Sequence, residues 1–224
     1  MTTKKKSTPE ATEATGAEPA ADKKPTGGGA VAAAQKILAD ESPQSKIAEH
    51  GETMMEGPRT AATQSARVLS EIITARPELV VPLVAKFARG VSSSNKRVVQ
   101  TSAEALPAIA RIAPARVARQ LDVLKSSFEE ANDVGKDGLV KTFAALCTAS
   151  VAYQKRLEPV LTLALDGADG KTLFAWSQIV LPALKGEPHA RARAVVEGRL
   201  DLIPRSYAQQ IADFLGIKLR LRYR

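Results

Sequence analysis

The side chains best suited to chemistry in this 224-residue chain are basic. Lysine and arginine total 32 against 24 acidic residues, which gives a net charge of +8 and an isoelectric point of about 9.7. Ammonium and guanidinium groups bind carboxylates and phosphates through charge-assisted hydrogen bonds. The excess charge therefore indicates either a solvated basic surface or contact with an anionic partner. For such a contact, the candidate partner-binding residues are Arg89, Arg116, Arg119, Lys155, Arg156, Arg191, Arg193, Lys218, Arg220, Arg222 and Arg224.

Residues that could support catalysis or bind a metal are sparse. Cys147 is the only cysteine, which excludes an internal disulfide framework and a cysteine-based zinc site. It lies in an apolar stretch, so we expect a buried and unreactive thiol. His50 and His189 are far apart in sequence, and neither a P-loop nor a GxSxG motif occurs. We therefore expect no catalytic residue, no metal and no cofactor.

The remaining side chains of interest have structural interpretations. Trp176 is the only tryptophan, and we expect it to pack in the core. Glu129, Glu130, Asp166 and Asp169 lie at the ends of predicted helices, where carboxylates act as caps or as solvated charge. No uninterrupted apolar stretch reaches 18 residues and the N-terminus lacks an apolar signal segment, so we expect a cytoplasmic protein without membrane contact.

The elements that must position the basic residues are predicted to be helices. Aromatic residues make up only 4% of the chain, and apolar residues recur at helical spacing from Pro58 onward. We expect four parts: a disordered low-complexity tail (1–29), a short helical lead-in or linker (30–57), a helical repeat domain (58–216) and a basic C-terminal segment (217–224).

The spacing predicts nine helices in the repeat domain and weaker helices in the lead-in before it. Within the lead-in, residues 30–40 should form a short helix, 44–50 another turn or two, and 51–57 a connection. The predicted repeat-domain helices cover residues 59–75, 78–89, 95–112, 115–130, 134–149, 154–166, 171–184, 188–201 and 205–215. Asn95, Asp133 and Asp169 are the expected N-caps, and Gly216 is the expected stop of the last helix.

An internal repeat is the most informative feature of the sequence. Residues 65–72 (SARVLSEI) align without a gap with residues 102–109 (SAEALPAI), 37 positions later. A proline follows each copy at the same separation, Pro77 and Pro114, and weaker copies follow further along the chain. A period of 35 to 40 residues with two helices per unit is typical of an α-solenoid, in which stacked helix pairs share a continuous core.

The segment 96–109 (KRVVQTSAEALPAI) resembles the first helix of a HEAT repeat, which carries a basic residue and valine, then alanine, then Ala-Leu and an aliphatic residue. The resemblance covers about residues 58–216 and implies an all-α solenoid of about four HEAT-like helix pairs and a closing helix. It also implies that the second helices, which carry most of the candidate basic residues, line a concave surface. The frequent Asp between the helices and Arg early in the second helix are missing here.

HEAT-like arrays bind proteins, peptides and nucleic acids, so the resemblance is compatible with three functions. The first is a non-catalytic binding or scaffold module that holds a protein partner, in particular an acidic one, on the basic concave surface. The alternative is sequence-independent binding of DNA or RNA through the same residues and the C-terminus. The outlier is a HEAT-like DNA glycosylase, an enzyme class that uses several tryptophans and a catalytic Asp. Here the position four residues after Trp176 is Val180.

The C-terminal segment has its own pattern. Residues 217–224 (IKLRLRYR) alternate between apolar and basic side chains. Alternation is typical of an extended strand, and a lone strand in a helical protein lacks backbone partners. The segment is therefore expected either to fray or to become ordered on a partner. The sequence does not indicate the oligomeric state.

Overall fold

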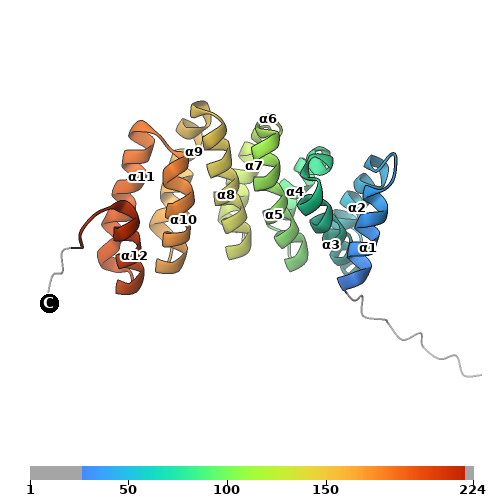
Figure 1. Cartoon of the computed structure of the whole chain (residues 1–224), viewed down its shortest axis with the longest axis horizontal. Coiled ribbons are helices and arrows are strands. Elements are labelled where there is room, and N and C mark those ends of the chain that lie inside the picture. Colours follow the sequence, from blue (N-terminus) through green and yellow to red (C-terminus); the bar gives the residue numbers. More distant parts are fainter. Residues whose placement is uncertain (1–26, 220–224) are drawn as a thin grey trace, which may run out of the picture.

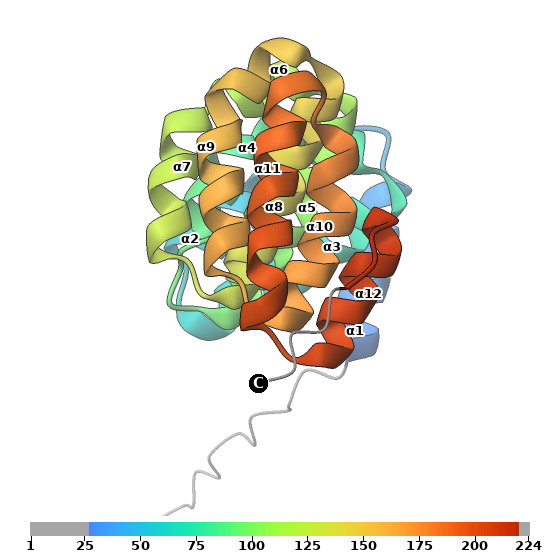
Figure 2. The ribbon, with the colours of Figure 1, turned by 90° about the vertical axis from the view of Figure 1, so that its left-hand side faces the viewer.

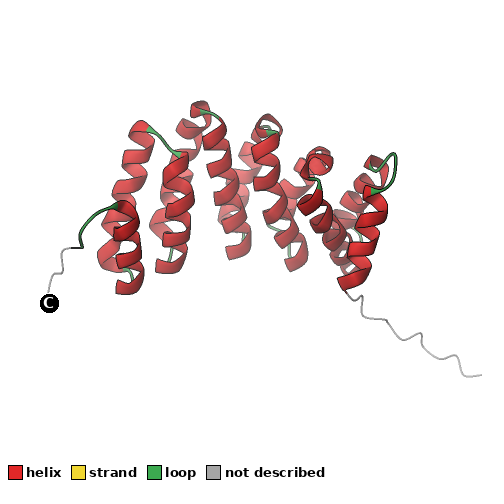
Figure 3. Ribbon diagram, viewed as in Figure 1, coloured by secondary structure: helices red, strands yellow, loops and turns green. Residues whose placement is uncertain are grey.

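The computed structural model describes residues 27–219, and within this range the chain forms helices and no strand (Figure 3). The elements are α1 (Gly27–Leu38), α2 (Gln44–Glu56), α3 (Arg59–Ala75), η1 (Pro77–Leu83), α4 (Val84–Gly90), α5 (Lys96–Ile112), α6 (Pro114–Ala118), α7 (Leu121–Glu130), α8 (Asp133–Ala149), α9 (Val151–Gly167), α10 (Gly170–Ala183), α11 (Gly186–Arg199), η2 (Leu200–Leu202) and α12 (Arg205–Leu215). The protein is therefore all-helical over its described length, as the composition predicts.

The helices stand side by side in a row that follows the chain from α1 to α12 (Figure 1). A view along the row shows two layers (Figure 2). The first layer holds α1, α3, α5, α8, α10 and α12, and the second holds α2, α4, α7, α9 and α11. Successive helices run in opposite directions, so the row has two edges. We call the edge at which α5 ends and α6 and α9 begin the upper edge. The opposite edge is called the lower edge.

Most helix boundaries agree with the predictions to within three residues, and two predicted helices are broken. The segment 78–89 begins as the 3-10 helix η1 and becomes α helical only at Val84. Pro82 lies inside η1 and cannot donate the backbone hydrogen bond of an α-helix. The segment 115–130 is divided into α6 and α7 by a turn in which the Gln120 amide donates to the Val117 carbonyl.

The N-terminal part is more ordered than its sequence suggests. Helix α1 begins at Gly27, so the expectation that the disordered tail extends to residue 29 is wrong at its end; residues 1–26 lie outside the described range. The expectation of a connection at 51–57 is also wrong, because α2 continues to Glu56. Both helices pack against α3, and Ile47, Gly51 and Met54 of α2 are buried. Burial of this apolar face is what extends α2 beyond its predicted end.

The predicted helix caps are largely confirmed. The Asn95 side chain accepts a hydrogen bond from the Arg97 amide, and the Asp169 side chain accepts one from the Thr172 amide at 2.7 Å. Asp133 is not a cap: Asn132 accepts from the Gly135 amide instead, and Asp133 is the first residue of α8. Gly216 ends α12 in the left-handed conformation, with φ at 68°.

The core runs between the two layers along the row. Leu69, Leu106 and Leu146, equivalent positions of the predicted repeat, are all fully buried. Hydrogen bonds also join the first-layer helices: Thr101 Oγ1 donates to the Ala66 carbonyl at 3.0 Å, and Ser70 Oγ donates to Glu104 at 2.7 Å. The backbones of α5 and α8 approach each other where Gly138 faces Ala103. Small residues at this crossing allow the close packing.

We expect the stability of the protein to fall as the pH decreases below about 6.5, because of His50. Its Nδ1 lies 3.1 Å from Ser65 Oγ, and partial burial lowers the pKa of the imidazole, with Glu49 opposing the shift. The unfolded chain therefore binds a proton at a higher pH than the folded chain does. Urea unfolding at pH 7.5 and 5.5 measures the loss, and His50→Gln should reduce it. A pH dependence unchanged in that variant would assign the proton to another group.

Candidate binding surface

Five basic side chains gather at the upper edge of the row. Arg116 and Arg119 belong to α6 and the residue after it, Lys155 and Arg156 to the first turns of α9, and Arg111 to the last turn of α5. Because α6 and α9 begin at this edge and α5 ends there, the five lie on one side of the molecule (Figure 1). All are exposed. We call Arg111, Arg116, Arg119, Lys155 and Arg156 the upper basic surface.

The charges of the upper basic surface are largely uncompensated. Within the described range, no carboxylate lies within ion-pair distance of Arg111, Arg116, Arg119 or Lys155. Arg156 has one distant partner, Asp122 Oδ1 at 3.7 Å, and both side chains are exposed. Exposed pairs of this kind contribute little free energy, so Arg156 can exchange its partner for a ligand at small cost.

Apolar side chains lie at the same edge. Ile112, the last residue of α5, and Val151, the first residue of α9, are 49% and 62% exposed. A shallow groove of about 400 Å³ adjoins them on the first-layer side, between α5, α8 and α10. Its lining consists of small and aliphatic residues with two cations at its margin: Arg111, Lys141, Ala144, Ala145, Thr148, Ala149 and Ile179.

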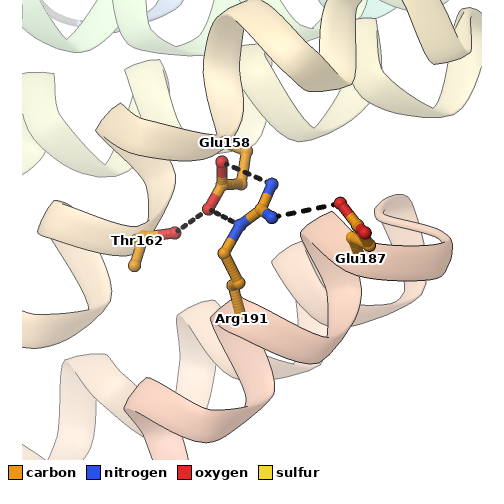
Figure 4. A network of polar contacts seen from close by, with 4 residues as sticks. All are labelled: Glu158, Thr162, Glu187 and Arg191. Atoms are coloured by element: carbon orange, nitrogen blue, oxygen red, sulfur yellow. Dashed lines mark hydrogen bonds and ion pairs between the residues drawn. The ribbon is translucent and has the colours of Figure 1, made fainter.

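Two predicted binding residues have internal partners instead (Figure 4). Arg191 binds Glu158 through two hydrogen bonds, from Nε to Oε1 at 3.0 Å and from Nη2 to Oε2 at 3.3 Å, and Nη1 lies 3.4 Å from Glu187. Glu158 is nearly buried and also accepts from Thr162. Removal of one partner of such a pair leaves an uncompensated charge in the protein. Arg191 therefore joins α11 to α9.

Arg193 has a similar internal role. Its Nε lies 2.7 Å from Glu197 Oε1, and its Nη2 donates to the Leu215 carbonyl at 3.1 Å. This second bond satisfies a carbonyl in the last turn of α12, which otherwise lacks an intrahelical donor. Arg193 thus holds the closing helix against α11, and it is not part of the upper basic surface.

The other predicted residues are dispersed. Arg89 is in the last turn of α4, at the lower edge, and Lys218 is exposed beyond α12 at the end of the row. Ile217 and Leu219, on either side of Lys218, pack against the core. Arg220, Arg222 and Arg224 lie outside the described residues. The structure therefore brings together four of the predicted residues, Arg116, Arg119, Lys155 and Arg156.

The structural interpretations of Trp176 and Cys147 are confirmed. Trp176 is buried, and its Nε1 donates to Asp137 Oδ1 at 3.0 Å. Cys147 is buried, and desolvation raises the pKa of its thiol to about 12, so the reactive thiolate is not formed near neutral pH. In residues 27–219 no three His, Cys, Asp or Glu side chains are grouped as a metal site would need, and no helix there is long and apolar enough to cross a membrane.

Sequence reasoning missed three residues of this edge. Arg111 and Ile112 end α5, and Val151 begins α9 three residues before its predicted start, whereas the prediction considered the second helices and the C-terminal segment. A signal was present for Arg111 and Ile112, as a basic residue followed by an aliphatic one just before Pro114. No protein-family model matches the chain, and no curated protein or solved structure matches it either.

Proposed function

We propose that the helix pairs are HEAT-like repeats stacked as a solenoid, and that the protein is a non-catalytic binding module. Hydrogen bonds between equivalent helices support the repeat: Thr101 reaches Ala66, 35 residues earlier, and Ser70 reaches Glu104, 34 residues later. These separations are close to the period of the aligned segments. The pair α1–α2 packs on α3 and extends the same arrangement toward the N-terminus.

The bound ligand in this proposal is an acidic segment of a protein partner. The observation that carries it is the upper basic surface, where four cations without a carboxylate partner in the described chain lie beside exposed Ile112 and Val151. Carboxylates of the partner would pair with the guanidinium groups, and its apolar side chains would cover the aliphatic residues.

Nucleic acid is the second candidate, because the same guanidinium groups could contact phosphates without base specificity. The exposed aliphatic side chains favour protein, since they have no partner on a phosphate backbone. Tyr153, the aromatic residue in the first turn of α9, packs against the core, where it is not displayed as a platform for base stacking.

Charge reversal tests the proposal. Arg116→Glu with Arg119→Glu should weaken binding of a peptide of Glu-Glu-Leu repeats by about 10-fold or more, measured by fluorescence anisotropy at low salt, because repulsion replaces attraction. The matched control is Arg89→Glu with Arg205→Glu, two exposed residues away from the upper edge, which should change the affinity by less than about 2-fold.

Duplex DNA of mixed sequence, about 20 base pairs long, serves as the second probe. If DNA binds more tightly than the peptide and its affinity falls with salt with a slope of about −0.9 per phosphate contact, the nucleic-acid function replaces the protein one. Equal effects of the two double variants on both probes would show that the upper basic surface is not the binding site.

A further inference from the structure

We propose that a cleft at the lower edge binds a basic, partly apolar segment of a protein partner. The cleft has a volume of about 780 Å³ and lies between the last turns of α7 and α9 and the first two turns of α8 and α10. Its apolar lining comprises Phe128, Leu163, Ala164, Ala168, Ala175 and Trp176. Leu163 is 64% exposed, so a covering partner would remove a large apolar side chain from water.

The cleft opens at an interruption of the second layer. In this layer α4 contacts α7 and α9 packs along α11, but α7 and α9 share no comparable contact. Asp122 of α7 and Arg156 of α9 approach to 3.7 Å near the starts of the two helices, and both side chains are exposed. The space that a packed neighbour fills elsewhere in this layer is therefore open to a ligand between the ends of α7 and α9.

The carboxylates in the lining favour a cationic ligand. Asp133 is exposed and has no hydrogen-bond or ion-pair partner in the described chain. The hydrogen bond from the Thr172 amide lowers the pKa of Asp169, so this carboxylate is ionised near neutral pH. Asp137 is already compensated by its ion pair with Lys141. Asp133 and Asp169 therefore remain to attract a cation.

The acidic residues at the ends of α7 and α9 indicate the same ligand charge. Glu129 and Glu130 lie in the last turn of α7 and Asp166 in the last turn of α9, and neither turn contains a basic residue. A helix C-terminus carries a partial negative charge, so acidic groups are unfavourable there and cations are favourable. The chain thus places negative charge beside the cleft where it reduces stability, and a bound cation would relieve the repulsion.

Basic residues around the cleft are fewer than acidic ones. Lys136 and Lys171 line it, and Lys136 lies over the Phe128 ring at 5.9 Å from its centre. The Arg199 guanidinium donates to the Ala168 carbonyl at 2.9 Å. The excess of carboxylates disfavours a polyanion such as nucleic acid, and the apolar lining favours a protein segment over a cation without apolar groups.

A segment that carries both lysine or arginine and leucine-like residues fits the two features. Its cations would pair with Asp133 and with the carboxylates at the ends of α7 and α9, while its aliphatic side chains would cover Leu163 and Phe128. The site does not depend on the proposed function of the upper basic surface, because the two surfaces lie at opposite edges and select opposite charges.

A labelled peptide of Lys-Lys-Leu repeats, added to the full-length protein at low salt, tests the cleft by fluorescence anisotropy. Asp133→Asn with Leu163→Asn should weaken its binding by about 10-fold or more, because a charge contact and an apolar contact are lost together. The matched control, Asp201→Asn with Leu202→Asn, makes the same changes at exposed positions of η2 and should alter the affinity by less than about 2-fold. An affinity that the cleft variant leaves unchanged, or that the control reduces equally, would overturn the proposal.

A second variant separates ligand binding from folding. Glu130→Lys with Asp166→Lys should weaken peptide binding by about 10-fold or more. It should leave the free energy of unfolding unchanged or raised, since lysine interacts favourably with a helix C-terminus. Trp176 is the only tryptophan and lines the cleft, so its emission should shift when the peptide binds the wild type and not the variant. Full peptide affinity in this variant would contradict a cationic ligand.

Two further probes define the ligand class. Spermine carries several cations without apolar side chains, and it should bind about 10-fold or more weakly than the peptide. Equal affinities would replace the protein segment by a small polyamine. The Glu-Glu-Leu peptide should bind both cleft variants as it binds the wild type, so failure at the cleft and failure at the upper basic surface are separate results.

Discussion

Replacing Gly138 with alanine is expected to destabilise the protein by about 3 kcal/mol. A Cβ atom at this position would lie 2.5 Å from the Cα atom of Ala103 and 2.9 Å from its carbonyl oxygen, and it would overlap the Ala103 Cβ atom. The opposing atoms belong to the backbone and its first side-chain carbon, so no flexible group can move aside. The helices α5 and α8 would have to separate, and Leu106 and the other side chains packed between them would lose contacts.

Chemical denaturation of the variant measures this loss. Gly198→Ala is the matched control, because Gly198 is exposed inside α11 and an added Cβ would have no neighbour within 4 Å. That substitution should stabilise the protein by about 0.5–1 kcal/mol, since alanine has the higher helix propensity. A Gly138→Ala variant as stable as the wild type would mean that α5 and α8 are further apart than described.

Gln154→Leu is expected to destabilise the protein by about 3–5 kcal/mol, because it removes three hydrogen bonds from buried groups. Its Nε2 donates to the carbonyls of Cys147 and Ala183, each at 3.1 Å, and its Oε1 accepts from the Lys185 amide at 3.1 Å. These groups belong to the last turn of α8, to the last residue of α10 and to the residue before α11. The single side chain thus joins three elements, and leucine fills the space without satisfying any of the three groups.

Thermal and chemical unfolding measure this effect against Gln178→Leu. Gln178 is exposed on α10 and has no hydrogen-bond partner within the described chain, so this change should alter stability by less than about 0.5 kcal/mol. A further check uses Gln154→Glu, which replaces the donor facing two carbonyls by a carboxylate and should also destabilise. Gln154 variants that resemble the Gln178 control would show that water takes over these hydrogen bonds.

The helical architecture was predictable because local signals agreed. Prolines and capping residues delimit the helices, and apolar spacing identifies the buried faces, as at Leu69 and Leu106. The continuation of α2 was not predictable, since it depends on packing against α3. The 3-10 conformation of η1 follows from Pro82. The sequence prediction placed an α-helix over 78–89 and did not account for the effect of this proline on the helix type.

The candidate binding surface was predictable only in part. Counting basic residues on the second helices selected Arg116, Arg119, Lys155 and Arg156, which the structure places at one edge of the row. It could not distinguish them from Arg191, whose partner Glu158 lies 33 residues earlier in the chain. Neutralisation of a charge depends on which side chains meet in space.

The arrangement of the helices in a row has a consequence for folding. Substantial contacts join helices that are neighbours in the row, so few contacts link distant parts of the sequence. Chains with such local contacts close short loops, and they fold rapidly for their length. Folding can begin at the tightest crossing, between α5 and α8, and spread outward one helix pair at a time. Among the described residues, the end helices α1 and α12 have neighbouring helices on one side only, and they would then be the first to exchange their amide hydrogens with solvent.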